Sequence, residues 1–547
     1  MDKLITNLKN IFEKHKKIFI IFGILLTVYL LYFHNLWNYE LLDVDETRYV
    51  DMSKTMFYSH DYLTLYLNGN YFFEKPPLYF WLENVSFLVF NSINEFSARI
   101  PGVLEGLLTG FILYIAVFKF TKDKFLALIS SLILLSFAEF IILSKIAILD
   151  ILLASTVSIS ILFGLITFAV SDKNKKFFWW GFYLFCALAV LAKGLPGLII
   201  PFFAMFLIGI YTKKLKEYFK LQYFLVGILI FLIMVLPWHV IMFKIHDPLF
   251  FNEYIMKHHI ARFLGGEVIG RDAPFWFYIP VLIWGSLPYA ASFIAMLVDK
   301  AKHFRFKKYD ESDLKGQFLI FCAICAFAIF LFFESSKTKL VTYILPIYPF
   351  LAVILGEYWY SYIKEGKNKK YIEISSKIFN WAGLISGVIY IIVLIFIPQP
   401  LKNDLLFVTF PSLLCLFIFL TTGLVAVKKE KRLLLFISYL LFIACISAFG
   451  FHKFLKMDYR LGQYDLIKYA KYAKAKNFNI FTYETGAKYS LLYYSGKKAR
   501  FDIKKEEIKS LLKNRFNVII IRKKDLKNLD GKFKIIDVGR KYILIKN

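Results

Sequence analysis

The chain has 547 residues, 58% of them hydrophobic, and a mean hydropathy of +0.57. Soluble globular proteins are about 45–50% apolar, so this composition excludes an ordinary soluble domain and predicts a membrane protein. The formal net charge of +28 does not indicate a nucleic-acid binder, because Lys and Arg gather in short clusters between apolar runs, where topology signals occur.

Long apolar runs predict an α-helical polytopic membrane protein, because a helix crosses the ~30 Å hydrocarbon core with about 20 residues. The first run follows Lys14, Lys16 and Lys17 and is too long for a cleaved signal peptide, so we interpret it as the first span. We predict 13 spans at residues 18–36, 99–118, 125–143, 148–170, 177–192, 195–211, 223–241, 275–298, 317–333, 341–362, 379–397, 405–427 and 432–451.

Every second connection between these spans is strongly basic, which places the N-terminus inside the cell and the C-terminus outside. The basic connections lie at residues 119–124, 173–176, 213–216, 305–308, 367–370 and 428–432. Residues 1–451 would then form the transmembrane domain, with two long outward loops at 37–98 and 242–274 around the active site. Within the first loop, Leu78–Phe90 is too short for a span and is predicted to lie along the membrane interface.

The tail, residues 452–547, loses the apolar runs and predicts a small soluble α/β domain with a supporting or acceptor-docking role. Its pattern indicates helices at 462–475, 486–495 and 504–513 and strands at 479–483, 517–521, 534–538 and 542–545.

Carboxylates near the predicted outer face are candidates for catalysis. Asp45 and Glu46 follow the first span, and either could deprotonate or orient an acceptor; a solvated acidic loop is the alternative. Asp150 lies in an apolar stretch, where an ionised carboxylate needs a partner. Structural pairing with Lys145 is the alternative to a catalytic role for Asp150.

Basic residues share that face, although outward Lys and Arg run against the positive-inside tendency. A cation before the stiff Pro76-Pro77 pair is well placed to hold a phosphate, and Arg binds phosphate oxygens in bidentate fashion. Snorkelling to the interface is the alternative for Lys193. The candidate phosphate-binding residues are Arg48, Lys75, Lys193, Arg262, Arg271, Lys337 and Lys339.

Carboxylates and cations on one outer face describe a reaction centre for a charged lipid, in which cations hold a leaving phosphate and carboxylates handle the acceptor. The sequence has no P-loop, no Ser-His-Asp set and no zinc motif of fixed spacing. Because sugar nucleotides are cytoplasmic, an outward site predicts a lipid-linked sugar donor.

Several motifs resemble those of bacterial aminoarabinose transferases, which belong to the wider protein-O-mannosyltransferase-like family. The resemblance covers most of residues 40–350 and rests on DETRY (45–49), FEKPPLYFW (73–81) and ARIP (98–101), with support from AKG (192–194), LPW (236–238), HIARF (259–263) and the segment 339–346.

This resemblance implies a GT-C fold of about 13 spans, a periplasmic C-terminal domain, and inverting transfer from an undecaprenyl-phosphate-linked sugar. It implies that Asp45 and Asp150 are the catalytic-site carboxylates and that Lys75, Lys193 and Arg262 contact the carrier phosphate. No cofactor is required, although Glu74 and His259 are a possible zinc pair.

The favoured function is transfer of a sugar to lipid A or lipopolysaccharide at the periplasmic face of the bacterial inner membrane, with no nucleic-acid partner. Pro77 departs from the lipid A enzymes and matches the broader family, so protein O-glycosylation on the same scaffold stays an alternative. A polyprenyl-lipid flippase or transporter is a third reading, but it should present polar residues at both faces or the midplane. The inner loops have Lys clusters without the matching carboxylates.

Overall fold

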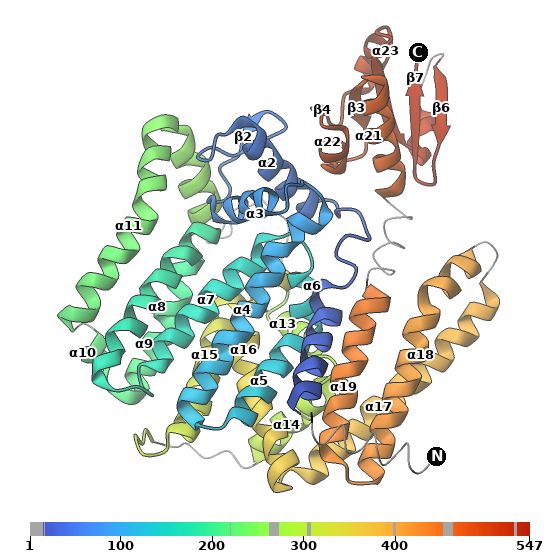
Figure 1. The fold of residues 1–547 in the computed structure, drawn as a ribbon. Coiled ribbons are helices and arrows are strands. Elements are labelled where there is room, and N and C mark those ends of the chain that lie inside the picture. Colours follow the sequence, from blue (N-terminus) through green and yellow to red (C-terminus); the bar gives the residue numbers. More distant parts are fainter. Residues whose placement is uncertain are drawn as a thin grey trace.

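The computed structural model describes residues 15, 17–218, 220–261, 273–302, 308–397, 401–451, 463–529 and 533–547. Within these ranges the side chains of residues 259, 401–409, 451 and 528 are not described. The fold consists of a helical bundle, a group of short elements at one end of the bundle, and a C-terminal α/β domain at that same end (Figure 1).

The bundle is built from long apolar helices (Figure 1). After a first helix, Lys17–Phe33, the chain forms α4 (Glu95–Thr121), α5 (Lys124–Ser136), α6 (Ala138–Ser144), α7 (Leu149–Ile166), α8 (Asp172–Lys193), α9 (Pro196–Thr212), α10 (Leu215–Tyr218) and α11 (Leu221–His246). It continues with α13 (Tyr278–Gly285), α14 (Ala290–Lys302), α15 (Leu314–Glu334), a 3-10 helix (Val341–Ile347), α16 (Tyr348–Tyr360), α17 (Lys369–Phe396), α18 (Leu401–Lys428) and α19 (Arg432–Cys445).

The predicted spans correspond to these helices. Among the described residues, nine helices are long and apolar enough to cross a membrane, and two bent pairs, α5 with α6 and α13 with α14, raise that number to 11. The helices at Lys17–Phe33 and Pro196–Thr212 coincide with the two remaining predicted spans but are shorter. The polytopic helical fold is confirmed, and the count of 13 stays a prediction.

Local sequence signals set where these helices begin and end. Asn94 and Ser97 form a reciprocal capping box that starts α4. The carboxylate of Asp123 accepts the N–H groups of Phe125 and Leu126 at the start of α5. Gly194, with φ of +79°, ends α8 in a backbone conformation that favours glycine.

The two bent helix pairs meet at their breaks. The chain turns by 65° between α5 and α6 and by 119° between α13 and α14. At the contact, the N–H of Ala138 donates to the carbonyl of Leu287 over 3.0 Å. Each break leaves backbone N–H and C=O groups without helical partners, and such groups are costly in an apolar environment. The contact between the breaks provides one of the missing hydrogen bonds for both.

Residues 37–94 cap one end of the bundle with α2 (Asp45–Ser59), a small hairpin of β1 (Tyr66–Leu67) and β2 (Asn70–Tyr71), and α3 (Leu78–Val89). Figure 1 shows α3 lying across the ends of the long helices, as the short apolar stretch predicted. The side chain of Asn84 on α3 donates to the carbonyl of Ser53 on α2 over 3.0 Å, and the Ser53 hydroxyl donates to the Glu83 carboxylate. These buried bonds fix α2 on α3.

The C-terminal domain has a five-stranded sheet of order β4-β3-β5-β7-β6, parallel between β4, β3 and β5 and antiparallel elsewhere. Separate apolar clusters fill the two faces of the sheet, one beneath α21 and α22 and the other beneath α23. The elements are α21 (Tyr464–Lys476), β3 (Asn479–Tyr483), α22 (Ser490–Ser495), β4 (Ala499–Arg500), α23 (Lys505–Leu512), β5 (Asn517–Arg522), β6 (Lys534–Val538) and β7 (Tyr542–Lys546).

The α/β character of the tail is therefore confirmed. Among the described strands of the tail, sequence pattern missed only the two-residue strand β4. The predicted boundary between the two domains, at residues 451 and 452, falls beside residues 452–462, which lie outside the described part of the chain. The division of the chain into 1–451 and 452–547 stays a prediction.

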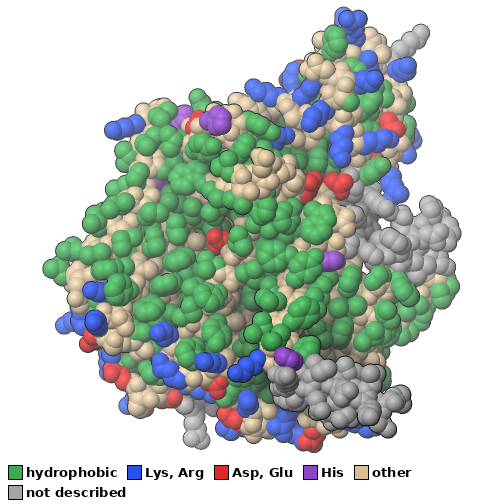
Figure 2. All heavy atoms as spheres, viewed as in Figure 1, with side chains coloured by type: hydrophobic (Ala, Val, Ile, Leu, Met, Phe, Trp, Pro, Cys, Tyr) green, Lys and Arg blue, Asp and Glu red, His purple; other side chains and the backbone are tan. Residues whose placement is uncertain are grey.

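The surface agrees with a membrane-embedded bundle. Figure 2 shows hydrophobic side chains covering the flank of the bundle, with Lys and Arg gathered at its lower end and over the C-terminal domain. The short helix α10 lies at that lower end, opposite α2, α3 and the C-terminal domain (Figure 1).

We predict that reporter fusions at Asp310 and at Asn547 report opposite sides of the membrane, because basic connections alternate along the chain. Paired alkaline phosphatase and cytoplasmic fluorescent fusions measure this. A fusion at Lys173 serves as the control and should behave like that at Asp310. If the fusions at Asp310 and Asn547 report the same side, the predicted topology is wrong, and so is the prediction that the candidate site faces outward.

Candidate functional site

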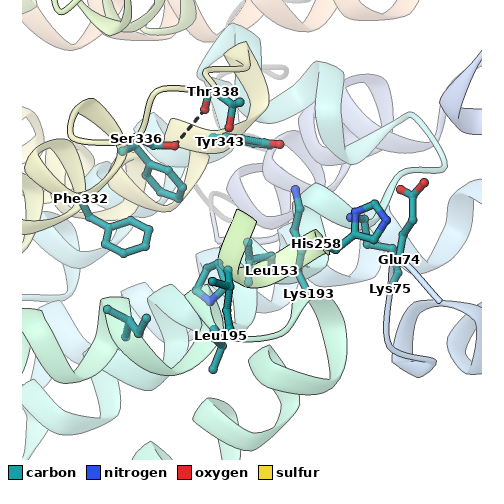
Figure 3. A pocket seen from close by; sticks show the side chains of 14 residues that line it. Glu74, Lys75, Leu153, Lys193, Leu195, His258, Phe332, Ser336, Thr338 and Tyr343 are labelled. Atoms are coloured by element: carbon teal, nitrogen blue, oxygen red, sulfur yellow. Dashed lines mark hydrogen bonds between the residues drawn. The ribbon is translucent and has the colours of Figure 1, made fainter. Parts of the chain in front are cut away.

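A cavity of about 340 Å³ lies at the end of the bundle that carries α2 and α3. Figure 3 shows Glu74, Lys75 and His258 on one side of it, Phe332, Ser336 and Thr338 on the other, and Lys193 between them. Apolar side chains make up most of the remaining wall. The lining residues are Glu74, Lys75, Leu153, Lys193, Leu195, Pro196, Ile199, His258, Ile260, Phe332, Phe333, Ser336, Thr338 and Tyr343.

A lysine–aspartate pair forms the polar centre of the cavity. The Nζ of Lys193 lies 2.5 Å from the Oδ1 of Asp150, and both side chains are nearly buried. Lys193 is in the last turn of α8 and Asp150 in the first turn of α7, so each charge is favoured by the dipole of its own helix. The hydroxyl of Thr342 donates to the same carboxylate oxygen over 3.0 Å.

This geometry decides between the alternatives for Asp150. Its partner is Lys193, not Lys145, whose Nζ donates instead to the carbonyl of His34 and the hydroxyl of Ser447. Snorkelling of Lys193 does not describe the structure, because its amine points into the cavity and lies 4.5 Å from the ring centre of Tyr343 (Figure 3).

A second lysine reaches the same carboxylate. Lys75 is 8% exposed, lines the cavity, and interacts electrostatically with Asp150. It is held in the stiff segment before Pro76 and Pro77, which leads directly into α3. Among the described residues, hydrogen bonding to Asp150 uses one of the three N–H donors of Lys193. The cavity can therefore offer ammonium donors to an anion without breaking this pair.

An exposed acidic residue is connected to the cavity wall through Arg48. The Oδ1 of Asp45 accepts from Arg48 over 2.7 Å, and the Asp45 side chain is 60% exposed. Arg48 is largely buried, stacks over the rings of Tyr49 and Phe72, and interacts electrostatically with Glu74 in the cavity wall. A continuous set of charges thus leads from exposed Asp45 to the cavity.

Glu46 is in a different environment from its neighbour. It is 1% exposed, and its carboxylate forms a bidentate ion pair with Arg99 at 2.7 and 3.0 Å. The N–H groups of Leu42 and Ala147 donate to the same two oxygens. Sequence reasoning grouped Glu46 with Asp45 as catalytic, but the structure places it in a buried ion pair outside the cavity.

The segment Ser335–Pro346 reaches the cavity through neutral residues. Ser336, Thr338 and Tyr343 line the wall (Figure 3). Lys339, predicted to bind phosphate, is buried, pairs with Glu334 and donates to the carbonyl of Pro274 over 3.1 Å. Lys337 is exposed and is not part of the lining.

Two predicted phosphate contacts, Arg262 and Arg271, lie outside the described residues, and the structure does not place them. The side chain of His259, the predicted zinc partner of Glu74, is also not described. Its neighbour His258 lines the cavity with Glu74 instead. No group of three or more His, Cys, Asp or Glu side chains suited to a metal ion occurs in the described part of the chain.

Sequence reasoning gave no role to three residues that the structure brings to the centre: His258, Thr342 and Tyr343. A sequence signal for Thr342 and Tyr343 was present, because both follow closely after Lys337 and Lys339, which were predicted to bind phosphate. Nothing in the pattern distinguishes His258 from His259, since adjacent residues differ only in the direction that the local backbone gives them.

Comparisons with known proteins agree with the motifs. Residues 17–251 match the profile of the dolichyl-phosphate-mannose-protein mannosyltransferase family. The chain is 28% identical over 360 residues to undecaprenyl phosphate-alpha-4-amino-4-deoxy-L-arabinose arabinosyl transferase 2 of Proteus mirabilis, covering 65% of this chain and 62% of that protein. Transferase 1 of the same organism is 29% identical over 381 residues, covering 69% and 66%. The aligned part thus spans less than two thirds of either relative.

The fold matches that of a solved structure over nearly the full length of both chains. The crystal structure of ArnT from Cupriavidus metallidurans bound to undecaprenyl phosphate superimposes with a TM-score of 0.77 at 18% identity, covering 96% of this chain and 97% of that one. The protein is therefore a polytopic membrane protein with a GT-C fold and a small C-terminal α/β domain. The resemblance to bacterial aminoarabinose transferases, predicted from the motifs, is confirmed by the alignments.

Proposed function

We propose that the protein is an integral-membrane glycosyltransferase that takes a sugar from an undecaprenyl-phosphate-linked donor. The observation that carries the proposal is the cavity in which Lys193 pairs with Asp150 and Lys75 interacts with the same carboxylate. Two ammonium groups near the end of the bundle suit the phosphate of a lipid carrier, and the apolar wall suits the first isoprene units. The curated relatives are named for the same type of donor.

The reaction follows from this placement. An acceptor oxygen attacks the anomeric carbon, the bond from that carbon to the phosphate oxygen breaks, and the carrier phosphate leaves with the electron pair. Lys75 and Lys193 stabilise the negative charge that grows on the leaving phosphate. Asp45, exposed and paired with Arg48, either takes the proton of a hydroxyl acceptor or orients an acceptor that is already ionised. A single displacement of this kind inverts the anomeric centre.

Lipid A or lipopolysaccharide is the favoured acceptor, because both Proteus mirabilis relatives are aminoarabinose transferases. The transferred sugar would then be a pentose, and the site would face the periplasm from the inner membrane. A protein acceptor is the second candidate, supported by the match of residues 17–251 to a protein mannosyltransferase family. Mass spectrometry of lipid A and of periplasmic glycoproteins from a deletion strain separates the two. A change in neither would count against both acceptors.

We expect Lys75→Ala to weaken use of the donor by roughly ten- to hundredfold, because a hydrogen bond to a charged group contributes about 1.5–3 kcal/mol. Transfer from a synthetic polyprenyl-phosphate sugar, measured in detergent or liposomes, gives the apparent affinity for the donor. Lys257→Ala is the matched control, since Lys257 lies on the same outer side, pairs with Glu253 and is absent from the cavity lining. An unchanged donor affinity in Lys75→Ala would remove this lysine from the phosphate site.

A further inference from the structure

The turn just before Asp45 is bonded to the C-terminal domain. The carboxylate of Asp43 accepts the N–H of Ser490 at 2.8 Å and the hydroxyl of Ser490 at 2.6 Å, through different oxygens. Ser490 is the first residue of α22, 447 positions along the chain. Two short bonds to one carboxylate specify the position of that side chain closely.

The same turn is bonded through its backbone. The side-chain amide of Gln463 accepts from the N–H of Asp43 at 3.1 Å and donates to the carbonyl of Leu41 at 2.7 Å. The N–H of Leu41 donates to the hydroxyl of Tyr494 at 2.8 Å, and that hydroxyl donates to Glu95 at 2.9 Å. Residues 41–43 are thus bonded both by the N-cap residue of α21 and by α22.

Asp43 also connects these hydrogen bonds from the C-terminal domain to α2. Its Oδ1 accepts from the hydroxyl of Thr47 at 2.6 Å, one turn into the helix that carries Asp45 and Arg48. The N-cap residue, Val44, has no side chain able to cap the helix. The carboxylate of Asp43 therefore joins the first turn of α2 directly to α22.

We propose that the C-terminal domain supports the active site: Asp43, bonded to Ser490 of that domain, is a positioning residue that holds Asp45 and Arg48 in place. This inference rests on the proposed transferase function and deepens it. It assigns the domain to the support of Asp45 and Arg48, whereas Lys75 and Lys193, which line the cavity, lie on other elements.

Docking of the domain does not depend on Asp43 alone. The ring of Tyr493 belongs to an apolar cluster with Leu41, Val50 and Phe87. Farther along, the side chain of Asn68 donates to the carbonyl of Ala499 at 2.6 Å and accepts its N–H at 3.0 Å. Removal of the Asp43 carboxylate should therefore release the turn while the domain stays attached.

The test compares Asp43→Ala with Asp43→Asn. The alanine variant loses all three side-chain contacts, so we expect kcat to fall about tenfold or more while the donor KM changes less than about threefold. The asparagine variant keeps an oxygen for the N–H of Ser490 and should recover most of the rate. Asp537→Ala is the matched control, because Asp537 accepts two bonds from Lys468 within the C-terminal domain.

A tether separates positioning from docking. Cysteines placed at Asn68 and Lys498 and joined by a short bismaleimide keep the domain attached, since residue 68 already bonds to residue 499. The tether should not restore the rate of Asp43→Ala; a restored rate would mean that Asp43 acts only by docking and would overturn the positioning role. Limited proteolysis of each variant reports attachment directly.

If wild-type protein transfers no sugar from a polyprenyl donor, the proposed function itself fails; an active wild type with an equally active Asp43→Ala overturns the positioning inference alone.

Discussion

Asp45→Asn should lose about 10²–10⁴-fold in transfer rate, the largest change we expect from one substitution that preserves size. Asp45 is an exposed carboxylate paired with Arg48, and asparagine keeps its hydrogen-bonding shape while removing basicity and charge. Transfer is measured in vitro at saturating donor across a range of pH. With a hydroxyl acceptor, the wild-type rate should fall toward acid pH, while the residual rate of the variant should stay flat.

Two controls accompany this measurement. With a phosphate acceptor, which is already ionised, the acid limb is absent and Asp45 acts by orienting the acceptor or Arg48. Glu484→Gln is a matched control for loss of an exposed carboxylate paired with arginine, because Glu484 pairs with Arg522 at 3.2 Å in the C-terminal domain. Near-normal turnover of well-inserted Asp45→Asn protein would remove Asp45 from the centre of the mechanism.

Glu46→Ala should destabilise the fold by about 3–5 kcal/mol, because it leaves the guanidinium of Arg99 buried and unpaired. Arg99 is fully buried, and besides Glu46 it donates to the carbonyls of Leu36, Tyr39 and Glu40. Thermal unfolding of the purified protein in detergent measures the loss. The donor KM of the fraction that remains folded should be unchanged.

A double variant tests the structural reading of this pair. Replacing both Glu46 and Arg99 with Met should recover part of the stability, because two apolar side chains leave no unpaired charge. Recovery should be partial, since the N–H groups of Leu42 and Ala147 lose their acceptor. A Glu46→Gln variant that is fully stable yet inactive would show that Glu46 acts in the chemistry, as the sequence suggested.

The fold was predictable where one strong physical signal acts alone. Apolar runs of span length identify the bundle because the membrane forces backbone groups into helices. The short continuous apolar run Val518–Ile521 identifies the central strand of the tail, which is buried on both faces of the sheet. Sequence pattern could not foresee the break at Phe137, because that segment remains apolar and the break is specified by a contact with a distant segment. The break at residues 286–289 has a local signal, Pro288, which the prediction of a single span at 275–298 did not use.

The site was predictable in its residue types and less so in its pairings. Lys75, Lys193 and Asp150, all predicted on one outer face, lie together, because a charge within an apolar run needs a partner. The partner that the sequence suggested for Asp150 was Lys145, which binds elsewhere. Glu46 and Lys339 look the same in sequence as their neighbours Asp45 and Lys337, yet both are buried in ion pairs. Burial depends on which way a helix faces and on partners such as Arg99 and Glu334, and adjacency along the chain does not carry that information.

The cavity lies where three helices end together. Asp150 is at the start of α7, Lys193 at the end of α8, and Pro196 at the start of α9, so helix termini fix the height of the charges. Under the proposed function, a carrier phosphate would always rest at this level, and its hydrocarbon chain would descend past Leu153 and Ile199. Such a site recognises the head group of the lipid and leaves the rest of the prenyl chain in the bilayer. Carriers with longer or shorter prenyl chains should therefore be used equally well.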